Sequence, residues 1–239
     1  MLTGCHCNRC HDKLCMHKVP ILASLDKEDL EKIADLITHH IFKKGETLLR
    51  EGDRTDSIVI IHEGSAKAYK TTADGREQIL YVFSEGDFFG EQNLLRNYYA
   101  TFSVEALQTL KTCHLSKTQF QQLLYSFPDI AIKIIDELGN RMTRLETALQ
   151  SMGVRNVDNR IGGILLEFAA KYGSEEPSGT VIHLPLSREG IANYLGVARE
   201  TVSRKFSQLE SEGVISSRNN KEILILDPEA LQNLAGAYE

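Results

Sequence analysis

A run of apolar residues between positions 135 and 152 places the strongest constraint on the fold of this chain. Its members lie alternately three and four positions apart: Ile135, Leu138, Met142, Leu145, Leu149 and Met152. This spacing lines one side of an α-helix and is typical of the seam of a two-stranded coiled coil. The sequence therefore predicts a helix from about Asp129 to Gly153, begun by Pro128, through which two copies of the chain pair. Packing within its own domain is the alternative, but the charges beside the seam, Arg141 and Arg144 among them, favour the dimer.

Short segments punctuated by glycine precede this helix, between Phe42 and His114. Four of them are rich in β-branched and aromatic residues: Ser57–Ile61, Ala66–Thr71, Gln78–Phe83 and Ala100–Ala106. Turn signals recur about every ten residues, and Asp74-Gly75 is a hairpin signal. We expect an all-β barrel or sandwich here, preceded by an amphipathic helix from Lys27 to His39.

The part of the chain after the long helix mixes helices and strands. A helix is predicted over Val157–Tyr172, followed by a loop rich in Gly, Ser and Pro and a strand at Val181–Leu184. Two short helices and a hairpin come next, with strands at Val214–Ser217 and Ile223–Leu226. Two helices followed by a β-hairpin describe a winged helix, so the whole chain is predicted to be of the α+β class.

The two short helices have the pattern of a helix-turn-helix. Ser187 is a favourable N-cap for the first helix, and Gly196 stands where the turn needs a positive φ. The outward face of the second helix carries Arg199, Glu200, Ser203 and Arg204. Arginine can bind O6 and N7 of guanine together, and glutamate can accept from N4 of cytosine. The pattern predicts that this helix reads DNA, whereas a solvated charged face is the plainer interpretation.

Four of the five cysteines lie within eleven residues near the start: Cys5, Cys7, Cys10 and Cys15, with Cys113 far away in the sequence. Thiolates grouped in this way suit zinc or an iron–sulfur cluster. Because no secretory signal and no apolar run of membrane-spanning length is visible, we expect a cytoplasmic protein without a membrane segment. Thiols stay reduced there, so ligands or redox sensors are favoured over structural disulfides.

Length and composition set the remaining limits. The 239 residues allow two ordinary domains, and 42% hydrophobic with 25% charged residues is typical of a globular protein. The net charge of −6 indicates that any binding to DNA depends on specific contacts more than on general attraction to phosphates. The sequence has no P-loop, nucleophile elbow or HExxH motif, so we expect no enzyme.

Taken together, these features resemble the CRP/FNR superfamily of transcription regulators over almost the whole chain, including the motif Gly86-Asp87-Phe88-Phe89-Gly90-Glu91. The resemblance implies a β-roll like the jelly roll of cyclic-nucleotide-binding domains, a long dimerisation helix and a winged helix-turn-helix. It implies four segments: a Cys/His-rich sensor (1–18), a β-roll effector domain (19–126), the dimerisation helix (127–155) and the DNA-binding domain (156–239).

The resemblance also implies what the protein binds. Glu200, Ser203 and Arg204 match the Glu-x-x-Ser-Arg motif of the FNR branch, whose half-site is TTGAT. Arg199 instead resembles the cyclic-AMP branch, in which arginine reads an extra guanine. A homodimer on a palindromic promoter site is implied, with RNA polymerase as a further partner.

For the signal, the resemblance favours the FNR branch. That branch ligates a [4Fe–4S] cluster with three N-terminal cysteines and one from the β-roll, here Cys7, Cys10, Cys15 and Cys113, with Cys5 as an alternative. The gap between Cys10 and Cys15 is one residue shorter than usual. Zinc bound by the N-terminal cysteines and histidines, or a disulfide switch involving Cys113, are the rival expectations. Cyclic-nucleotide sensing is disfavoured because residues 97–102 lack the arginine that holds the ligand's phosphate in that branch.

Overall fold

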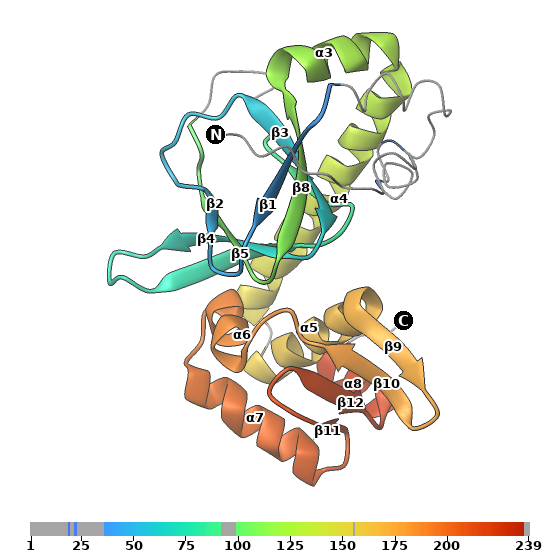
Figure 1. The fold of residues 1–239 in the computed structure, drawn as a ribbon. Helices are drawn as coiled ribbons and strands as arrows, with labels where there is room; N and C mark the ends of the chain where they lie inside the picture. The colour runs from blue at the N-terminus through green and yellow to red at the C-terminus, as the bar shows by residue number, and fades with distance from the viewer. Residues whose placement is uncertain (1–18, 20–21, 23–35, 92–98, 155, 237–239) are drawn as a thin grey trace. The chain divides into compact units, whose positions relative to one another are not determined.

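The computed structural model describes residues 19, 22, 36–91, 99–154 and 156–236, with the side chains of 144, 145 and 147–154 left aside (Figure 1). The chain divides into two compact units. The first comprises residues 1–70 and 80–142, and the second comprises residues 71–79 and 143–239. The division falls within the long helix α4 (Pro128–Val154). None of the helices in the described ranges is long and apolar enough to cross a membrane.

Two four-stranded sheets form the body of the first unit (Figure 1). One has the order β1 (Thr38–Phe42), β8 (Leu110–Ser116), β3 (Ser57–Glu63) and β6 (Phe88–Phe89). The other has the order β2 (Thr47–Leu49), β7 (Ser103–Ala106), β4 (Ala66–Thr71) and β5 (Glu77–Phe83). Two helices follow β8: α3 (Lys117–Ser126) and then α4.

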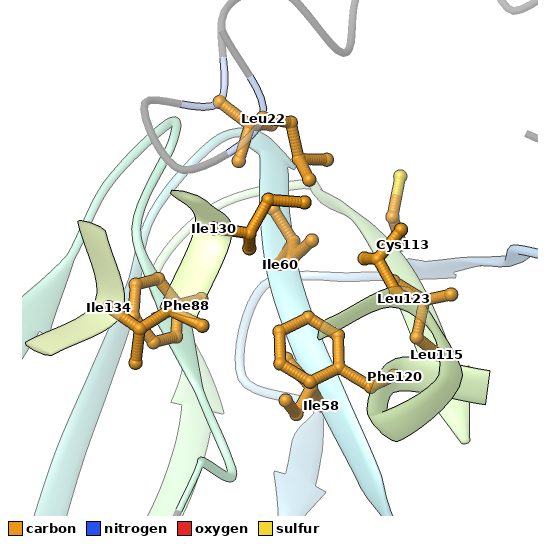
Figure 2. Close-up of a cluster of buried hydrophobic side chains, with 11 residues drawn as sticks. Leu22, Ile58, Ile60, Phe88, Cys113, Leu115, Phe120, Leu123, Ile130 and Ile134 are labelled. Atoms are coloured by element: carbon orange, nitrogen blue, oxygen red, sulfur yellow. The ribbon is translucent and has the colours of Figure 1, made fainter. Parts of the chain in front are cut away.

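The central strand β3 contributes to two hydrophobic cores because its side chains alternate between the faces of the sheet. Ile58 and Ile60 belong to a cluster with Val19, Leu22, Phe88 of β6 and residues of β8, α3 and α4. Figure 2 labels most of its members, among them Cys113, Leu115, Phe120, Leu123, Ile130 and Ile134. Val59 and Ile61 belong to a second cluster with Phe83, Phe89 and residues of β4, β7 and β8. Each cluster is apolar, so burial on both sides holds β3 in place.

The sequence predictions for the first unit hold with two corrections. The strands over 57–61, 66–71 and 78–83 are confirmed, and so are the turn at Asp74-Gly75 and the long helix. Residues 100–102 are not strand: the chain makes only an isolated bridge between Arg54 and Tyr99 before β7 begins. The helix expected over Lys27 to His39 is wrong at its end, because β1 starts at Thr38, and residues 27–35 lie outside the described part of the chain.

The second unit contains the C-terminal elements, which are α5 (Val157–Tyr172), β9 (Gly173–Glu176), β10 (Gly179–His183), α6 (Arg188–Leu195), α7 (Arg199–Ser211), β11 (Ile215–Ser217), β12 (Glu222–Ile225) and α8 (Pro228–Ala235). The sheet has the order β11, β12, β10, β9. Helices α5 and α8 approach closely at Gly162, where a Cβ would lie 2.9 Å from the backbone nitrogen of Ala235. The predicted winged helix is confirmed. Residues 173–176, expected as loop, form the exposed strand β9 instead.

Candidate functional site

The turn between α6 and α7 has the geometry that the sequence predicts. The Ser187 hydroxyl accepts a hydrogen bond from the Gly190 amide at 3.1 Å and so caps α6. Gly196 ends α6 in the left-handed region, with φ of +65°, where a side chain would be strained. Ala198, the N-cap of α7, makes no side-chain capping bond. Because its N-cap residue supplies no side-chain acceptor, backbone amides in the first turn of α7 can bind a phosphate.

Helix α7 buries one face and exposes the other. Val202, Phe206 and Leu209 are buried, which fixes the rotation of the helix. Arg199, Glu200 and Arg204 are exposed, and Ser203 is partly exposed. Within the described ranges, none of the three exposed charged residues forms an ion pair. The four predicted DNA-contacting side chains are therefore presented together, and no described residue forms an ion pair with the three charged ones.

Lys205, which follows Arg204, does not share this exposure. Its side chain is only 7% exposed, and its Nζ lies 2.9 Å from Oδ2 of Asp158 on α5. This ion pair, which is buried only on the Lys205 side, joins α7 to α5. A count of charges along the sequence treats Lys205 as part of the basic surface, whereas the structure assigns it to packing.

We expect Arg204→Ala to weaken binding to a TGA-containing palindrome by about 1–3 kcal/mol, because it removes a bidentate guanine contact. Affinity for random DNA should change much less. Fluorescence anisotropy on the two duplexes at one salt concentration measures the difference. An equal loss on both would make Arg204 a phosphate contact and refute the base assignment.

Cys113, the described member of the predicted ligand set, lies in β8 and is 6% exposed. It belongs to the same apolar cluster as Val19 and Leu22, the described residues that follow the cysteine-rich segment (Figure 2). In that view its sulfur lies toward the end of the cluster where Leu22 is found and away from Phe120. Cys5, Cys7, Cys10 and Cys15 lie outside the described residues.

Three histidines lie near Cys113 on β1 and β8. His39 Nδ1 lies 3.5 Å from the Cys113 sulfur, and His40 and His114 are 4.4 Å apart between ring centroids. Burial lowers the pKa of His114 to about 4, with His40 and His39 adding to the effect. Burial, followed by the charges of His62 and His40, also lowers the pKa of His39. Within the described part of the chain, no three His, Cys, Asp or Glu side chains converge as a metal site.

The predicted dimer seam is solvent-exposed along the part of α4 whose side chains are described. Ile135 is 67% exposed, Met142 60% and Leu138 38%. Large apolar side chains at such exposure indicate a surface that another chain covers. The side chains of Leu145, Leu149 and Met152 lie outside the described set.

Arg141 has a role that the sequence did not reveal. It was expected beside the dimer seam, but its guanidinium lies 3.3 Å from Oε1 of Glu91 and 2.6 Å from the carbonyl oxygen of Phe88. It also stacks on the Phe88 ring, at 4.6 Å from the centroid, and pairs with Glu137. Arg141 and Glu91 are fifty residues apart, so no local pattern in the sequence predicts their contact.

Glu91 is nearly enclosed by this arrangement. Burial raises the pKa of its carboxyl, and the charge of Arg141 opposes that rise. Its Oε2 atom is buried and has no hydrogen-bond partner among the described residues. The ion pair therefore joins α4 to the end of β6. The positive charge of Arg141 offsets the free-energy cost of burying the Glu91 carboxylate.

Arg141→Gln is expected to lower the free energy of unfolding by about 3 kcal/mol, because it leaves Glu91 buried without a cation. Glu91→Gln should cost only about 1 kcal/mol, since Arg141 keeps Glu137 and the Phe88 carbonyl. Urea unfolding of both variants and of the double variant measures this asymmetry. If both single variants lower the free energy of unfolding equally, the burial of an unpaired Glu91 carboxylate is not the main cost of losing Arg141.

Comparisons with known proteins match each part of the chain. Residues 39–126 match the cyclic nucleotide-binding domain, and residues 159–234 match the Crp-like helix-turn-helix domain. The nitrogen fixation regulation protein FixK of Bradyrhizobium diazoefficiens is 32% identical over 218 residues, which cover 91% of this chain and 90% of that protein. The transcriptional activator protein FnrA of Stutzerimonas stutzeri is 28% identical, covering 97% of this chain and 93% of the relative.

The solved structure of FixK2 from Bradyrhizobium japonicum has the same fold. It superposes with a TM-score of 0.75 at 24% identity, over 85% of this chain and 99% of that one. Three findings point to the same family. They are the order of β-roll, long helix and winged helix-turn-helix, the exposed Arg199–Arg204 face, and the near-complete coverage of relatives. The chain belongs to the CRP/FNR family, whose members are transcription regulators that bind DNA as dimers and are not enzymes.

Proposed function

We propose that this regulator responds to oxygen through a [4Fe–4S] cluster held by Cys7, Cys10, Cys15 and Cys113, with Cys5 as the alternative to Cys7. The observation that carries the proposal is the position of Cys113. It shares one apolar cluster with Val19 and Leu22, which directly follow the cysteine-rich segment. The buried Cys113 thiol therefore lies beside the residues that follow the N-terminal cysteines.

The donor set fits this cofactor on grounds of reach and chemistry. Cys15 precedes Val19 by four residues, which span at most about 14 Å when fully extended. A span of this length allows Cys15 to reach the β-roll cluster that contains Val19 and Cys113. Four thiolates are the usual ligands of a cubane cluster, and the one described here is largely shielded from water.

In the mechanism that we propose, Cys7, Cys10, Cys15 and Cys113 would hold the cluster, which when bound would supply an oxygen-sensitive link between the N-terminal segment and β8. Cys113 anchors the β-roll end of this link. Arg141 and Glu91 join β6 to α4, so a change at the β-roll can reach the helix that carries Ile135, Leu138 and Met142. Pairing along that helix places two α7 helices in successive major grooves, about 34 Å apart.

At the DNA, the proposed roles follow from side-chain chemistry. Arg204 binds a guanine of the TGA core, Glu200 accepts from a cytosine amine, and Ser203 completes the reading of the half-site. Arg199, at the start of α7, reads the bases outside the core. The relative FnrA carries a name that describes it as a transcriptional activator, which supports RNA polymerase as a further partner.

Purification without oxygen, followed by an absorption spectrum and analysis of iron, sulfide and zinc, tests the proposal. The expected result is a coloured protein with about four irons per chain that bleaches in air. A colourless protein with one zinc per chain would instead support a structural zinc site. A metal-free protein whose DNA binding responds to oxidants would support a disulfide switch.

A cyclic nucleotide is the least favoured signal on structural grounds. Arg141 supplies a cation beside Glu91, but Glu91, Glu137 and the Phe88 carbonyl already engage it. A cavity of about 390 Å³ that reaches Gly90 is lined by Asp53, Asp56 and Arg54, so among the described lining residues a phosphate would meet more negative than positive charge.

A further inference from the structure

His39 stands directly opposite Cys113 across the antiparallel pair of β1 and β8. Residues opposite each other in such a pair project to the same face of the sheet. His39 Nδ1 and Cys113 Sγ are 3.5 Å apart, which is within hydrogen-bonding distance for sulfur. The contact therefore follows from the register of the sheet and does not depend on a flexible loop.

Two neighbouring histidines, His40 and His114, are arranged differently. His40 and His114 flank the contact in sequence and pack on each other, and His114 Nε2 lies 2.8 Å from the Thr112 hydroxyl. Side chains alternate along a strand, so both lie on the face opposite to Cys113. His40, the immediate neighbour of His39, is therefore a matched control. It is the same residue type on the same strand, but it faces away from Cys113.

The chemistry of a ligating sulfur fixes the direction of this hydrogen bond. A thiolate bound to a metal carries no proton and can only accept, so Nδ1 of His39 must donate. His39 is not a candidate for an additional ligand, because each iron of a cubane takes one protein thiolate, and Cys113 already occupies that place in the proposed set. Hydrogen bonds to the sulfurs are among the factors that set the reduction potential of such clusters.

Resting on the proposed function, we propose that His39 is a positioning residue that donates an Nδ1 hydrogen bond to the Cys113 sulfur and thereby tunes the cluster. One-electron reduction adds negative charge to the cluster and its sulfurs. A donor binds the more negative state more strongly, since hydrogen bonds to charged acceptors are about twice as strong as neutral ones. His39 therefore makes the cluster easier to reduce and harder to oxidise.

The test compares three variants with the parent, all prepared without oxygen. His39→Leu replaces the donor with an apolar side chain of similar size, whereas His39→Gln keeps an N–H group. His40→Leu is the control on the opposite face of β1. Iron and sulfide content, the visible spectrum and the midpoint potential, measured by spectroelectrochemistry, are the readouts, and thermal unfolding confirms that each variant is folded.

We expect all four proteins to hold the same iron content. His39→Leu should shift the equilibrium constant for one-electron reduction about tenfold toward the oxidised state, which is about 59 mV more negative. Its sulfur-to-iron absorption band should shift as well. His39→Gln should recover much of the parent potential, and His40→Leu should match the parent.

Other outcomes would overturn the inference in distinguishable ways. If the parent holds iron and His39→Leu has the same midpoint potential, the proposed role of the His39 hydrogen bond is refuted. The proposed function is not affected by that result. Loss of iron from both His39 variants would make His39 a ligand or a structural residue. A parent without iron would refute the proposed function, and the role of His39 with it.

Discussion

Cys113→Ser in protein prepared without oxygen is expected to lose iron and specific DNA binding together. The residue is 6% exposed and lies in an apolar cluster, and serine differs from cysteine by one atom, so the β-roll should remain folded. The loss would then report on ligation and not on packing. Iron analysis, anisotropy on the palindromic site and a thermal melt of the same sample measure the three quantities.

The same variant separates the rival roles of the cysteines. If the N-terminal residues bind zinc by themselves, metal content and DNA binding should be unchanged by Cys113→Ser. If a disulfide is the switch, the variant should behave like the reduced parent, and only its response to oxidant should disappear. A full four-iron cluster in Cys113→Ser would contradict the ligand assignment, and combining it with Cys5→Ser would show whether Cys5 had replaced it.

Met142→Glu and Ile135→Glu are each expected to weaken dimerisation by about 100-fold or more. Both side chains are largely exposed in the single chain, at 60% and 67%, so neither is needed for the fold of its own unit. In the dimer a glutamate would place an unpaired charge in an apolar seam, which costs several kcal/mol. Sedimentation over a range of protein concentrations measures the change.

Tyr125→Glu is the matched control for the dimer variants. Tyr125 is 87% exposed on α3, outside the proposed seam, so the variant should dimerise like the parent. If Met142→Glu and Ile135→Glu also sediment as the parent dimer, the interface lies elsewhere on the chain. Weakened dimers should lose affinity for a full palindrome much more than for a single half-site.

Local patterns explain which parts of the fold could be predicted. The apolar spacing after Pro128 and the residues Ser187 and Gly196 at the ends of α6 are local signals, so α4 was predicted nearly to the residue and α6 at both of its ends. Strand β9 was missed because Gly-Ser-Glu-Glu has no apolar face: it is exposed throughout and is held by backbone pairing with β10.

Contacts distant in the sequence account for what was missed at the sites. His39 lay at the end of an expected helix, and only the register of β1 against β8 brings it to Cys113. The partnership of Arg141 with Glu91 likewise depends on how α4 packs against β6. Cys113 and the motif that ends at Glu91 could be identified from the sequence. Their partners, His39 and Arg141, could not, because those contacts depend on tertiary packing.

The central claim is that an intact cluster promotes binding to DNA, and one measurement tests it most directly. Anaerobic protein is titrated onto a labelled palindrome of TTGAT half-sites and onto a scrambled duplex, then exposed to air in steps while cluster absorbance and affinity are followed in the same sample. The account predicts that specific affinity falls in proportion to the absorbance lost. Specific affinity that stays constant while the absorbance disappears would contradict it.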